Sequence, residues 1–416
     1  MRQASIGYRV LMLLENNPYP QDPRVRNEAE TLAAAGYEVS VIAPAGPRQP
    51  FRERVGNVEV RRYRPPRAVP GALGYVWEYG YSLVAVWVLS LGVWLSRGVD
   101  VVHAHNPPDV FFIIGGMFRL FGKKFVFDHH DLAPEMYTAK FGARARPLLV
   151  RLLVLCERMS CRLAHSVIAT NESYRLMEMQ RSAVPPDRIT VVRNGPDLKR
   201  LVSVEPDQAL RAKASIIFAY LGTLGVQDGV DYLLRALLHL KVDLHRTDWY
   251  CIIIGRGDAL EDLMSLTSRL GLNEQIMFTG RAGLIPDADL IRYISTADIC
   301  VDPDPSNPFN DRSTMLKVME YMTLGKPTVA FDLPEHRRTA GEAAVYVTPN
   351  DEPAFARALA ALMDDPVRRQ EMGRVGRHRV ETVLAWPHSA HHLLESYRRL
   401  TGQPHRQVAA LTPPAQ

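Results

Sequence analysis

The chain has 416 residues, of which 47% are hydrophobic and 23% are charged, and its net charge is +5. This length exceeds one hydrophobic core of ordinary size, and this composition is typical of a soluble globular protein. The positive charge fits an anionic substrate or an acidic membrane surface, but it is spread along the chain without a DNA- or RNA-binding motif, so no nucleic-acid partner is expected.

The cysteines and the N-terminal residues indicate a cytoplasmic protein. The N-terminal residues lead directly into a strand, without the apolar region and cleavage site of a secretory signal. The cysteines have no spacing typical of a zinc site or a redox pair, and a disulfide framework in so long a chain would be sparse. They are Cys156, Cys161, Cys251 and Cys300.

The first half of the chain alternates segments typical of strands with segments typical of helices. Strands are predicted at 8–15, 38–43, 100–105, 124–128, 166–170 and 189–193, and helices at 25–35 and 110–121. Such alternation implies a parallel sheet covered by helices on both faces. Residues 1–195 are therefore predicted to form one Rossmann-like α/β domain.

A second alternating series follows a linker at 194–214, where the apolar period is lost. Strands are predicted at 216–221, 250–254, 276–279, 299–301 and 328–331, so 196–385 forms a second Rossmann-like domain. Ligands collect at the carboxyl ends of strands in such sheets, which places the site in a cleft between facing domains. Pro387 should break the helix at 367–384, so that a last helix at about 386–401 crosses back onto the first domain. Residues 402–416 are predicted to be disordered.

The segment 310–334 carries the strongest functional signal. Ser313 and Thr314 are predicted to cap a helix that runs to Leu324 and is ended by Gly325. Ser313, Lys317 and Glu320 then share one helix face.

That helix face fits a nucleotide. The free N–H groups at Ser313–Met315 and the positive end of the helix dipole fit a phosphate, Lys317 adds a cation, and Glu320 fits the diol of a ribose. The alternative is an ordinary surface helix with a Lys317–Glu320 ion pair.

This segment is similar to the donor-binding signature of the family 4 retaining glycosyltransferases. In that family a glutamate, here Glu320, precedes the pattern hydrophobic-x-hydrophobic-G-x-P-hydrophobic-V-A and holds the ribose. The similarity covers nearly the whole chain, including RVRNEAETLAAAGYEVSVIAP, RITVVRNGPD and FAYLGTLGVQDGVDYLLRAL. It implies the GT-B fold: two Rossmann-like doubly wound α/β domains facing a central cleft, with the C-terminal helix crossing back. It also implies that the acceptor hydroxyl attacks on the face that the diphosphate leaves.

In the first domain the resemblance points to His130, within FDHHDLAPE, as the histidine near the donor sugar. The alternative is a histidine that caps a strand end. Asp131 is expected to orient His130 or to cap the next turn. His103 and His105 end the preceding strand and are expected to line the same cleft, where three histidines also raise the alternative of a metal site.

In the second domain Gly222 and Gly255 end strands, where glycine lets the backbone approach a ligand. Arg281 ends a third strand, where the family lays the nucleotide base. The family's diphosphate clamp of an arginine and a lysine is missing, because those positions are Thr223 and Gln227-Asp228 in this chain. A second departure is Arg312, which replaces a glutamate that the family has eight residues before Glu320. Lys317 is the first choice for the missing cation. Arg281 and Arg312 are the other candidates, and Arg24 and Arg26 could supply the cation only on domain closure.

No metal or other cofactor is expected. Asp302-Pro303-Asp304 matches the Asp-x-Asp pattern by which another glycosyltransferase class holds a divalent ion against a diphosphate. The pattern is short, however, and Pro303 stiffens the turn and removes a backbone donor. We therefore predict metal-independent transfer.

The segment from Tyr81 to Leu95 is nearly all apolar and follows an arginine-rich stretch. Its fifteen residues are too few to span a bilayer, which needs about 20. A helix in the membrane interface, on the inner face of the cytoplasmic membrane, and a helix buried against the first sheet both remain open.

The predicted function is retaining transfer from a nucleoside diphosphate sugar to a glycan or lipid-linked acceptor, in the synthesis of a surface polysaccharide such as an exopolysaccharide or O-antigen. Two alternatives differ in product. A sugar-nucleotide epimerase of the same fold would convert the free donor without an acceptor. A non-catalytic subunit would bind the donor and leave it unchanged.

Overall fold

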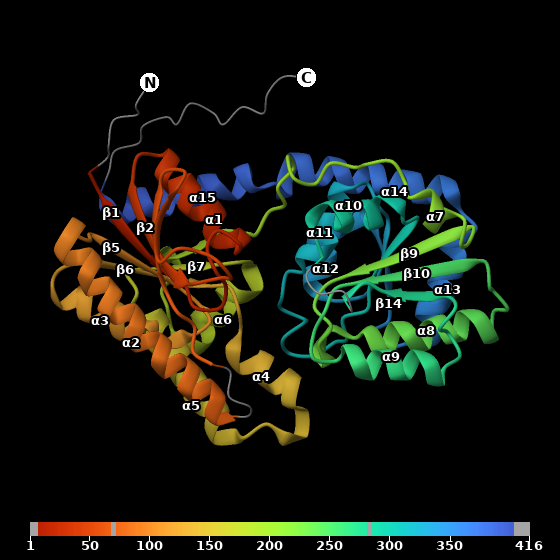
Figure 1. Ribbon diagram of the computed structural model, residues 1–416, viewed down its shortest axis with the longest axis horizontal. Helices are drawn as coiled ribbons and strands as arrows, with labels where there is room; N and C mark the ends of the chain where they lie inside the picture. The colour runs from red at the N-terminus through yellow and green to blue at the C-terminus, as the bar shows by residue number, and fades with distance from the viewer. Residues whose placement is uncertain (1–6, 68–71, 281–284, 403–416) are drawn as a thin grey trace. The chain divides into compact units, whose positions relative to one another are not determined.

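The structure, a computed structural model, describes residues 7–67, 72–280 and 285–402, and none of the side chains of Ala72, Leu73, Tyr75 and Val76. It divides into two compact units (Figure 1). Unit 1 comprises Met1–Thr138, Ala143–Arg193 and Trp386–Gln416, and unit 2 comprises Ala139–Gly142 and Asn194–Ala385. The tail that was predicted to be disordered lies, from residue 403 on, outside the described residues.

Unit 1 is built on an eight-stranded sheet with the order β3-β4-β2-β1-β5-β6-β7-β8. The stretch from β4 to β7 has the strand order of a Rossmann sheet, which confirms the predicted fold class. All neighbouring pairs are parallel except β3 and β4. The strands are β1 Arg9–Leu13, β2 Glu38–Pro44, β3 Arg52–Val55, β4 Val58–Tyr63, β5 Val101–His105, β6 Lys124–His129, β7 Ser166–Ala169 and β8 Ile189–Val191.

The antiparallel hairpin of β3 and β4 was not predicted. Its sequence, RERVGNVEVRRY, is rich in charges and lacks the apolar run that indicates a buried strand. This fits its position, since β3 is an edge strand and its first residue, Arg52, is exposed. Gly56 makes the tight turn in the left-handed region at φ +57°. The hairpin extends the sheet beyond β2 without changing the strand order at β1 and β5.

The helices of unit 1 include the last helix of the chain. α15 buries Leu393, Leu394 and Tyr397 in the same core as residues of β1 and α1, so the C-terminal helix crosses back as predicted. The break lies at Ala385, whose backbone is extended, and Pro387 occupies the first turn of α15. The other helices of this part of the chain are α1 Pro23–Ala34, α2 Ala72–Arg97, α3 Phe112–Leu120, α4 Ala133–Phe141, α5 Pro147–Leu163 and α6 Glu172–Ser182, and α15 is Trp386–Thr401.

Unit 2 contains a parallel six-stranded sheet with the order β11-β10-β9-β12-β13-β14, again that of a Rossmann sheet. The strand order reverses between β9 and β12, where such sheets bind their ligands. The strands are β9 Ile216–Leu221, β10 Trp249–Ile254, β11 Ile276–Phe278, β12 Ile299–Asp302, β13 Thr328–Phe331 and β14 Ala344–Val347. The helices are α7 Gln208–Arg211, α8 Val230–Val242, α9 Leu260–Arg269, α10 Asp287–Thr296, α11 Leu316–Thr323, α12 Pro334–Ala340, α13 Glu352–Met363 and α14 Pro366–Arg379.

Helix α2 is longer than the apolar segment that predicted it. It has 26 residues, because it continues through the glycines and the glutamate that precede Tyr81. Its portion Trp77–Arg97, 21 residues, is long and apolar enough to cross a membrane by length and composition alone. The fifteen residues of the prediction are therefore only part of a longer helix, whose length alone does not exclude a membrane span. Only 22% of its apolar window is buried.

Candidate functional site

Helix α11 begins later than predicted. Its first residue is Leu316, and the preceding residue, Met315, is extended and makes no side-chain capping bond. Ser313 belongs instead to a turn, where its N–H and its Oγ both donate to the carbonyl of Phe309. The prediction that Ser313 caps the helix was therefore wrong. The first-turn N–H groups of α11 have no side-chain cap among the described residues, which leaves this end suited to an anion.

Lys317 is buried in unit 2 and pairs with acidic residues that follow β12. Its Nζ lies 2.7 Å from Asp304 Oδ1 and 3.2 Å from Asp302 Oδ1, and 4.9 Å from the centre of the Tyr220 ring. The alternative of a surface Lys317–Glu320 ion pair is excluded, because Lys317 is only 9% exposed and Glu320 pairs elsewhere.

His336, from α12, completes this group and was not predicted. Its Nε2 lies 3.1 Å from Asp302 Oδ2, and its Nδ1 donates to the carbonyl of Phe331 at 2.8 Å. The only sequence signal for it was its place shortly after the carboxyl end of β13. Asp302, Asp304, Lys317 and His336 are called the switch-point cluster below, because β12 adjoins the reversal of strand order.

The four side chains of the switch-point cluster shift one another's pKa values. Burial opposes the charged form of Asp302, but Lys317 and His336 outweigh it and hold its pKa below the usual range. Burial, and then the charge of Asp302, raise the pKa of Asp304. Burial opposes protonation of Lys317 and His336 as well, but the carboxylates raise the pKa of both. The cluster therefore favours the charged forms of Lys317, His336 and Asp302 and the neutral form of Asp304.

The predicted glycines lie in loops that approach one another closely. A Cβ on Gly255 would lie 1.8 Å from the Gly222 carbonyl oxygen, and a Cβ on Gly280 would lie 2.0 Å from that of Gly255. These positions need glycine for contact between the loops themselves, whether or not a ligand is bound. Thr223 accepts a hydrogen bond from the Tyr220 hydroxyl through its carbonyl, at 2.9 Å. Arg281 lies outside the described residues.

Glu320 is held by an arginine from the segment that was predicted as a linker. Arg200 Nη2 donates to Glu320 Oε1 at 2.7 Å, and Arg200 Nη1 donates to Asp287 at 3.0 Å. Sequence reasoning missed Arg200, which lies 120 positions from its partner. A carboxylate has about four lone-pair positions, so Glu320 keeps acceptor capacity and its role toward a ribose stays a prediction.

In unit 1, His130 lies beside Asp128, the next-to-last residue of β6. Its backbone N–H and that of Asp131 donate to Asn106 Oδ1 at 2.8 and 3.1 Å, which fixes the loop. The His130 ring is 10% exposed, and its Nδ1 lies 3.6 Å from Asp128 Oδ1. Burial opposes protonation of His130, but the Asp128 carboxylate outweighs it and raises the His130 pKa. Burial raises the pKa of Asp131, whose carbonyl accepts from Asn106 Nδ2.

Asp128 also binds Arg24, which was a candidate for the diphosphate. Arg24 Nε and Nη2 donate to the two oxygens of Asp128 at 2.7 and 2.8 Å. Arg24 is 5% exposed, so the prediction that it contacts a diphosphate is not supported. His103 and His105 are fully buried, and burial lowers the pKa of both. They lie in the core of unit 1, beneath its surface.

Comparisons with known proteins agree on one family. Residues 21–195 match a family model described as "Glycosyl transferase 4-like domain", and residues 215–365 match one described as "Glycosyl transferases group 1". The alpha-D-kanosaminyltransferase of Streptomyces kanamyceticus is 25% identical over 84% of this chain and 91% of its own length.

Two solved structures share the fold. A sucrose-phosphate synthase from Thermosynechococcus elongatus superposes with a TM-score of 0.77, at 21% identity, over 95% of this chain and 99% of its own. The Anabaena protein HepE, solved in complex with UDP-glucose, superposes with a TM-score of 0.69, at 15% identity, over 94% of this chain and 99% of its own.

Proposed function

Because the chain belongs to the family 4 glycosyltransferases of the GT-B fold, we propose that it transfers a sugar, with retention, from a nucleoside diphosphate donor to a glycan or lipid-linked acceptor in surface polysaccharide synthesis. The switch-point cluster is the observation that carries this proposal. It combines buried Lys317, a histidine, His336, whose pKa is raised by the Asp302 carboxylate, and the start of α11 at the place where a Rossmann sheet binds its ligand.

These groups suit the charge that develops during transfer. As the sugar–oxygen bond breaks, negative charge grows on the diphosphate, and fixed cations and N–H groups in a buried site stabilise it without reorganisation. Glu320, one turn beyond Lys317, would bind the ribose, while Arg200 fixes its orientation. A donor phosphate oxygen would take the acceptor's proton, as the resemblance implies, so no protein nucleophile is needed. The UDP-glucose complex of HepE supports a donor of this class.

The same cluster supports diphosphate binding without a metal ion. Asp302, Asp304 and His336 lie close enough to bind a divalent cation. Lys317 Nζ, however, lies within 3.2 Å of both carboxylates and so already supplies them with a cation. We expect the transfer rate to be unchanged when Mg²⁺ or Mn²⁺ is added.

A panel of sugar nucleotides tests the proposed function. A true donor at a hundred times its dissociation constant should stabilise the protein by about 2.7 kcal/mol in a thermal-shift experiment. With an acceptor extract, the same donor should yield a glycosylated product with retained configuration. Conversion of the donor without an acceptor would indicate an epimerase. Binding without transfer or hydrolysis would indicate a non-catalytic subunit.

Glu320→Gln is expected to weaken binding of the nucleoside part of the donor. A hydrogen bond to a charged group contributes about 1.5–3 kcal/mol, and a neutral amide contributes less. Calorimetry should therefore show an affinity for the nucleoside that falls about tenfold, with little change for inorganic pyrophosphate. Glu371→Gln, at an exposed glutamate of α14, is the matched control. Unchanged nucleoside affinity would remove the ribose assignment.

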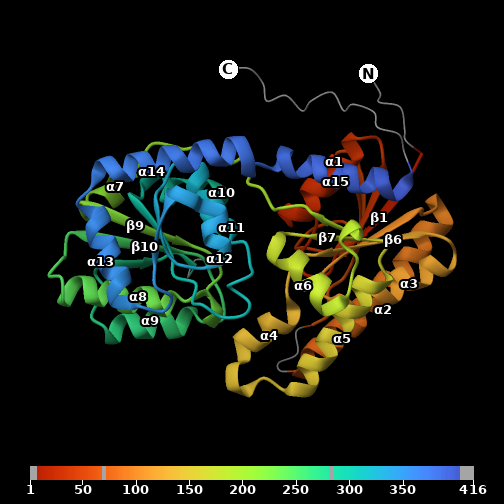
Figure 2. The same cartoon turned by 180° about the vertical axis from the view of Figure 1, so that it is seen from behind.

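We further propose that unit 1 binds the inner face of a membrane through α2, α3 and α5, which lie side by side in both views (Figure 2). These helices expose large apolar side chains. They are Trp77, Val84, Trp87, Val88 and Leu95 on α2, Leu120 and Phe121 at the end of α3, and Leu148, Leu152 and Leu155 on α5. Arg151 and Arg158 are exposed on α5. Apolar side chains beside arginines fit an anionic lipid surface.

Flotation with vesicles tests the membrane contact. Val84→Glu/Val88→Glu should abolish flotation with anionic vesicles without unfolding the protein, because both valines are more than half exposed. Val86 would be a poor target, since it is fully buried. The matched control is Val367→Glu/Val383→Glu, two exposed valines of unit 2. Flotation that both double variants retain equally would contradict the contact.

A further inference from the structure

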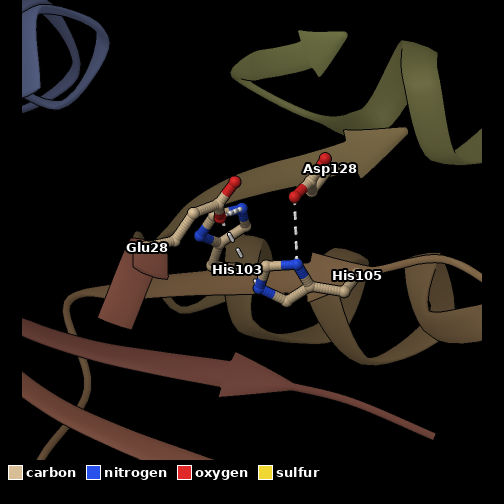
Figure 3. Close-up of side chains that lie close together, drawn as sticks. All are labelled: Glu28, His103, His105 and Asp128. Carbon is tan, nitrogen blue, oxygen red and sulfur yellow. Dashed lines mark hydrogen bonds and ion pairs between the residues drawn. The ribbon is translucent and has the colours of Figure 1, made fainter. Parts of the chain in front are cut away.

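Three buried side chains of unit 1 point their polar atoms at one another (Figure 3). His103 and His105 are two positions apart on β5, so they share one face of the strand. Glu28, from α1, lies against that face. Its Oε2 is 3.7 Å from His103 Nε2 and 4.0 Å from His105 Nε2, and the two imidazole rings stack with centroids 4.3 Å apart.

The facing atoms lack partners. His103 Nε2, His105 Nε2 and both oxygens of Glu28 make no hydrogen bond to any residue that the structure describes. All three residues are 0% exposed. Buried polar atoms without partners are costly, and native proteins nearly always satisfy them. The geometry therefore indicates a ligand at the point on which these atoms converge.

The other ring nitrogens are already held, as they are in histidines that bind metals. His105 Nδ1 lies 3.0 Å from Asp128 Oδ2, which fixes its proton on Nδ1 and leaves the lone pair on Nε2. His103 Nδ1 lies 2.8 Å from the Tyr397 hydroxyl of α15. Each imidazole is thereby oriented with its Nε2 toward Glu28.

Arg24 lies between the carboxyl groups of Asp128 and Glu28 and binds Asp128 more closely. Arg24 makes its short bidentate contact with Asp128 and donates to the Val192 carbonyl, while its nearest approach to Glu28 is 3.2 Å. Asp128 therefore compensates Arg24. Arg24 contacts Glu28 through Oε1, whereas Oε2 is the oxygen that faces the two imidazoles.

We propose that Glu28 Oε2, His103 Nε2 and His105 Nε2 bind one divalent transition-metal ion, with Zn²⁺ as the first choice. Imidazole and carboxylate are ligands that Zn²⁺ accepts, and they bind it at about 2.0–2.2 Å, which sets neighbouring ligand atoms about 3.4 Å apart in a tetrahedral site. The observed separations of 3.7 and 4.0 Å lie within about 0.6 Å of that spacing. The ion is structural: it joins β5 to α1 and, through Tyr397, to α15. This ion is distinct from one that would bind a diphosphate. In the proposed function the switch-point cluster binds the diphosphate without an ion.

Refolding of the full chain tests this site. Protein made without a metal-affinity tag is unfolded in denaturant with a chelator, then refolded with Zn²⁺, with Co²⁺ or with neither. We expect one ion per chain to remain after dialysis, visible absorption bands from bound Co²⁺, and a folding equilibrium constant about a hundredfold higher when free ion is a hundred times its dissociation constant. The proposal would be overturned if the unfolding transitions were identical with and without metal and no ion were retained. The facing atoms would then share a proton instead.

Variants locate the ion. Glu28→Gln keeps the side-chain shape and should lose the Co²⁺ bands. The matched control is His391→Ala/His392→Ala, a pair of adjacent exposed histidines on α15 that could bind metal adventitiously. The control should retain the ion. Loss in the control with retention in Glu28→Gln would place the ion on the surface and overturn the proposal. If Glu28→Gln does not fold, the wild-type refolding experiment alone decides.

Discussion

Replacing Lys317 with methionine is expected to lower the free energy of unfolding by about 3 kcal/mol, because removing one partner from a buried group of charges leaves a buried carboxylate poorly compensated. Asp302, which is fully buried, then keeps His336 as its cationic neighbour, at 3.1 Å. The same variant should bind the nucleoside diphosphate product at least about tenfold more weakly, since a charged hydrogen bond is lost, while affinity for the bare nucleoside barely changes. Urea unfolding and calorimetry with both ligands measure these effects.

Two further variants separate stability from binding. Lys317→Met/Asp302→Asn removes both charges and should recover much of the stability, but not the affinity for the diphosphate. Lys326→Met is the control for loss of a partly buried lysine, because Lys326 Nζ donates to two backbone carbonyls, those of Ser295 and Ala297. It should leave diphosphate affinity unchanged. Unchanged affinity in Lys317→Met would move the search for the cation to the arginines, with Arg312 first.

His130→Ala is expected to lower kcat by about 10²–10³-fold, the cost of losing one transition-state contact in a preorganised site. The dissociation constant of the donor should change much less, because the contact is expected to form with the reacting sugar. Single-turnover rates and calorimetry distinguish the two quantities.

Asn106→Ala provides a comparison, since Asn106 holds the backbone of the His130 loop without carrying the imidazole. It should lower kcat less than His130→Ala does. His391→Ala, an exposed histidine of the same unit, should have no effect. Equal losses of kcat and donor affinity in His130→Ala would make His130 a positioning residue.

The sequence predicted the strands of unit 2 best. β9 and β13 begin and end at the predicted residues, because each is an apolar run between turn formers and is buried on both faces. The start of α11 was missed, because Ser313 is chemically suited both to a helix cap and to the turn that it forms. Local pattern cannot decide between these uses, since the preceding loop determines which carbonyl Ser313 meets.

The partners of the site residues could not be predicted. Lys317 and Asp302 were each identified, one as a phosphate ligand and the other in an Asp-x-Asp pattern, but their pairing depends on the packing of α11 against β12. Arg200 and His336 reach the site from segments without a recognisable motif. In unit 1, His103 is covered by Tyr397 of α15, which is nearly 300 residues away in the chain.

The return of α15 to unit 1 has a consequence for synthesis on the ribosome. The strands of unit 1 are complete by Arg193, but its core lacks Leu393, Leu394 and Tyr397 until the last helix is made. At 5–20 residues per second, translation of the intervening chain takes roughly 10 to 40 s. During that interval unit 2, most of which is one contiguous stretch, is free to fold first. The nascent unit 1 meanwhile exposes the apolar side chains of α1 and β1 that α15 will cover, and His103 lacks its Tyr397 partner until that helix is made.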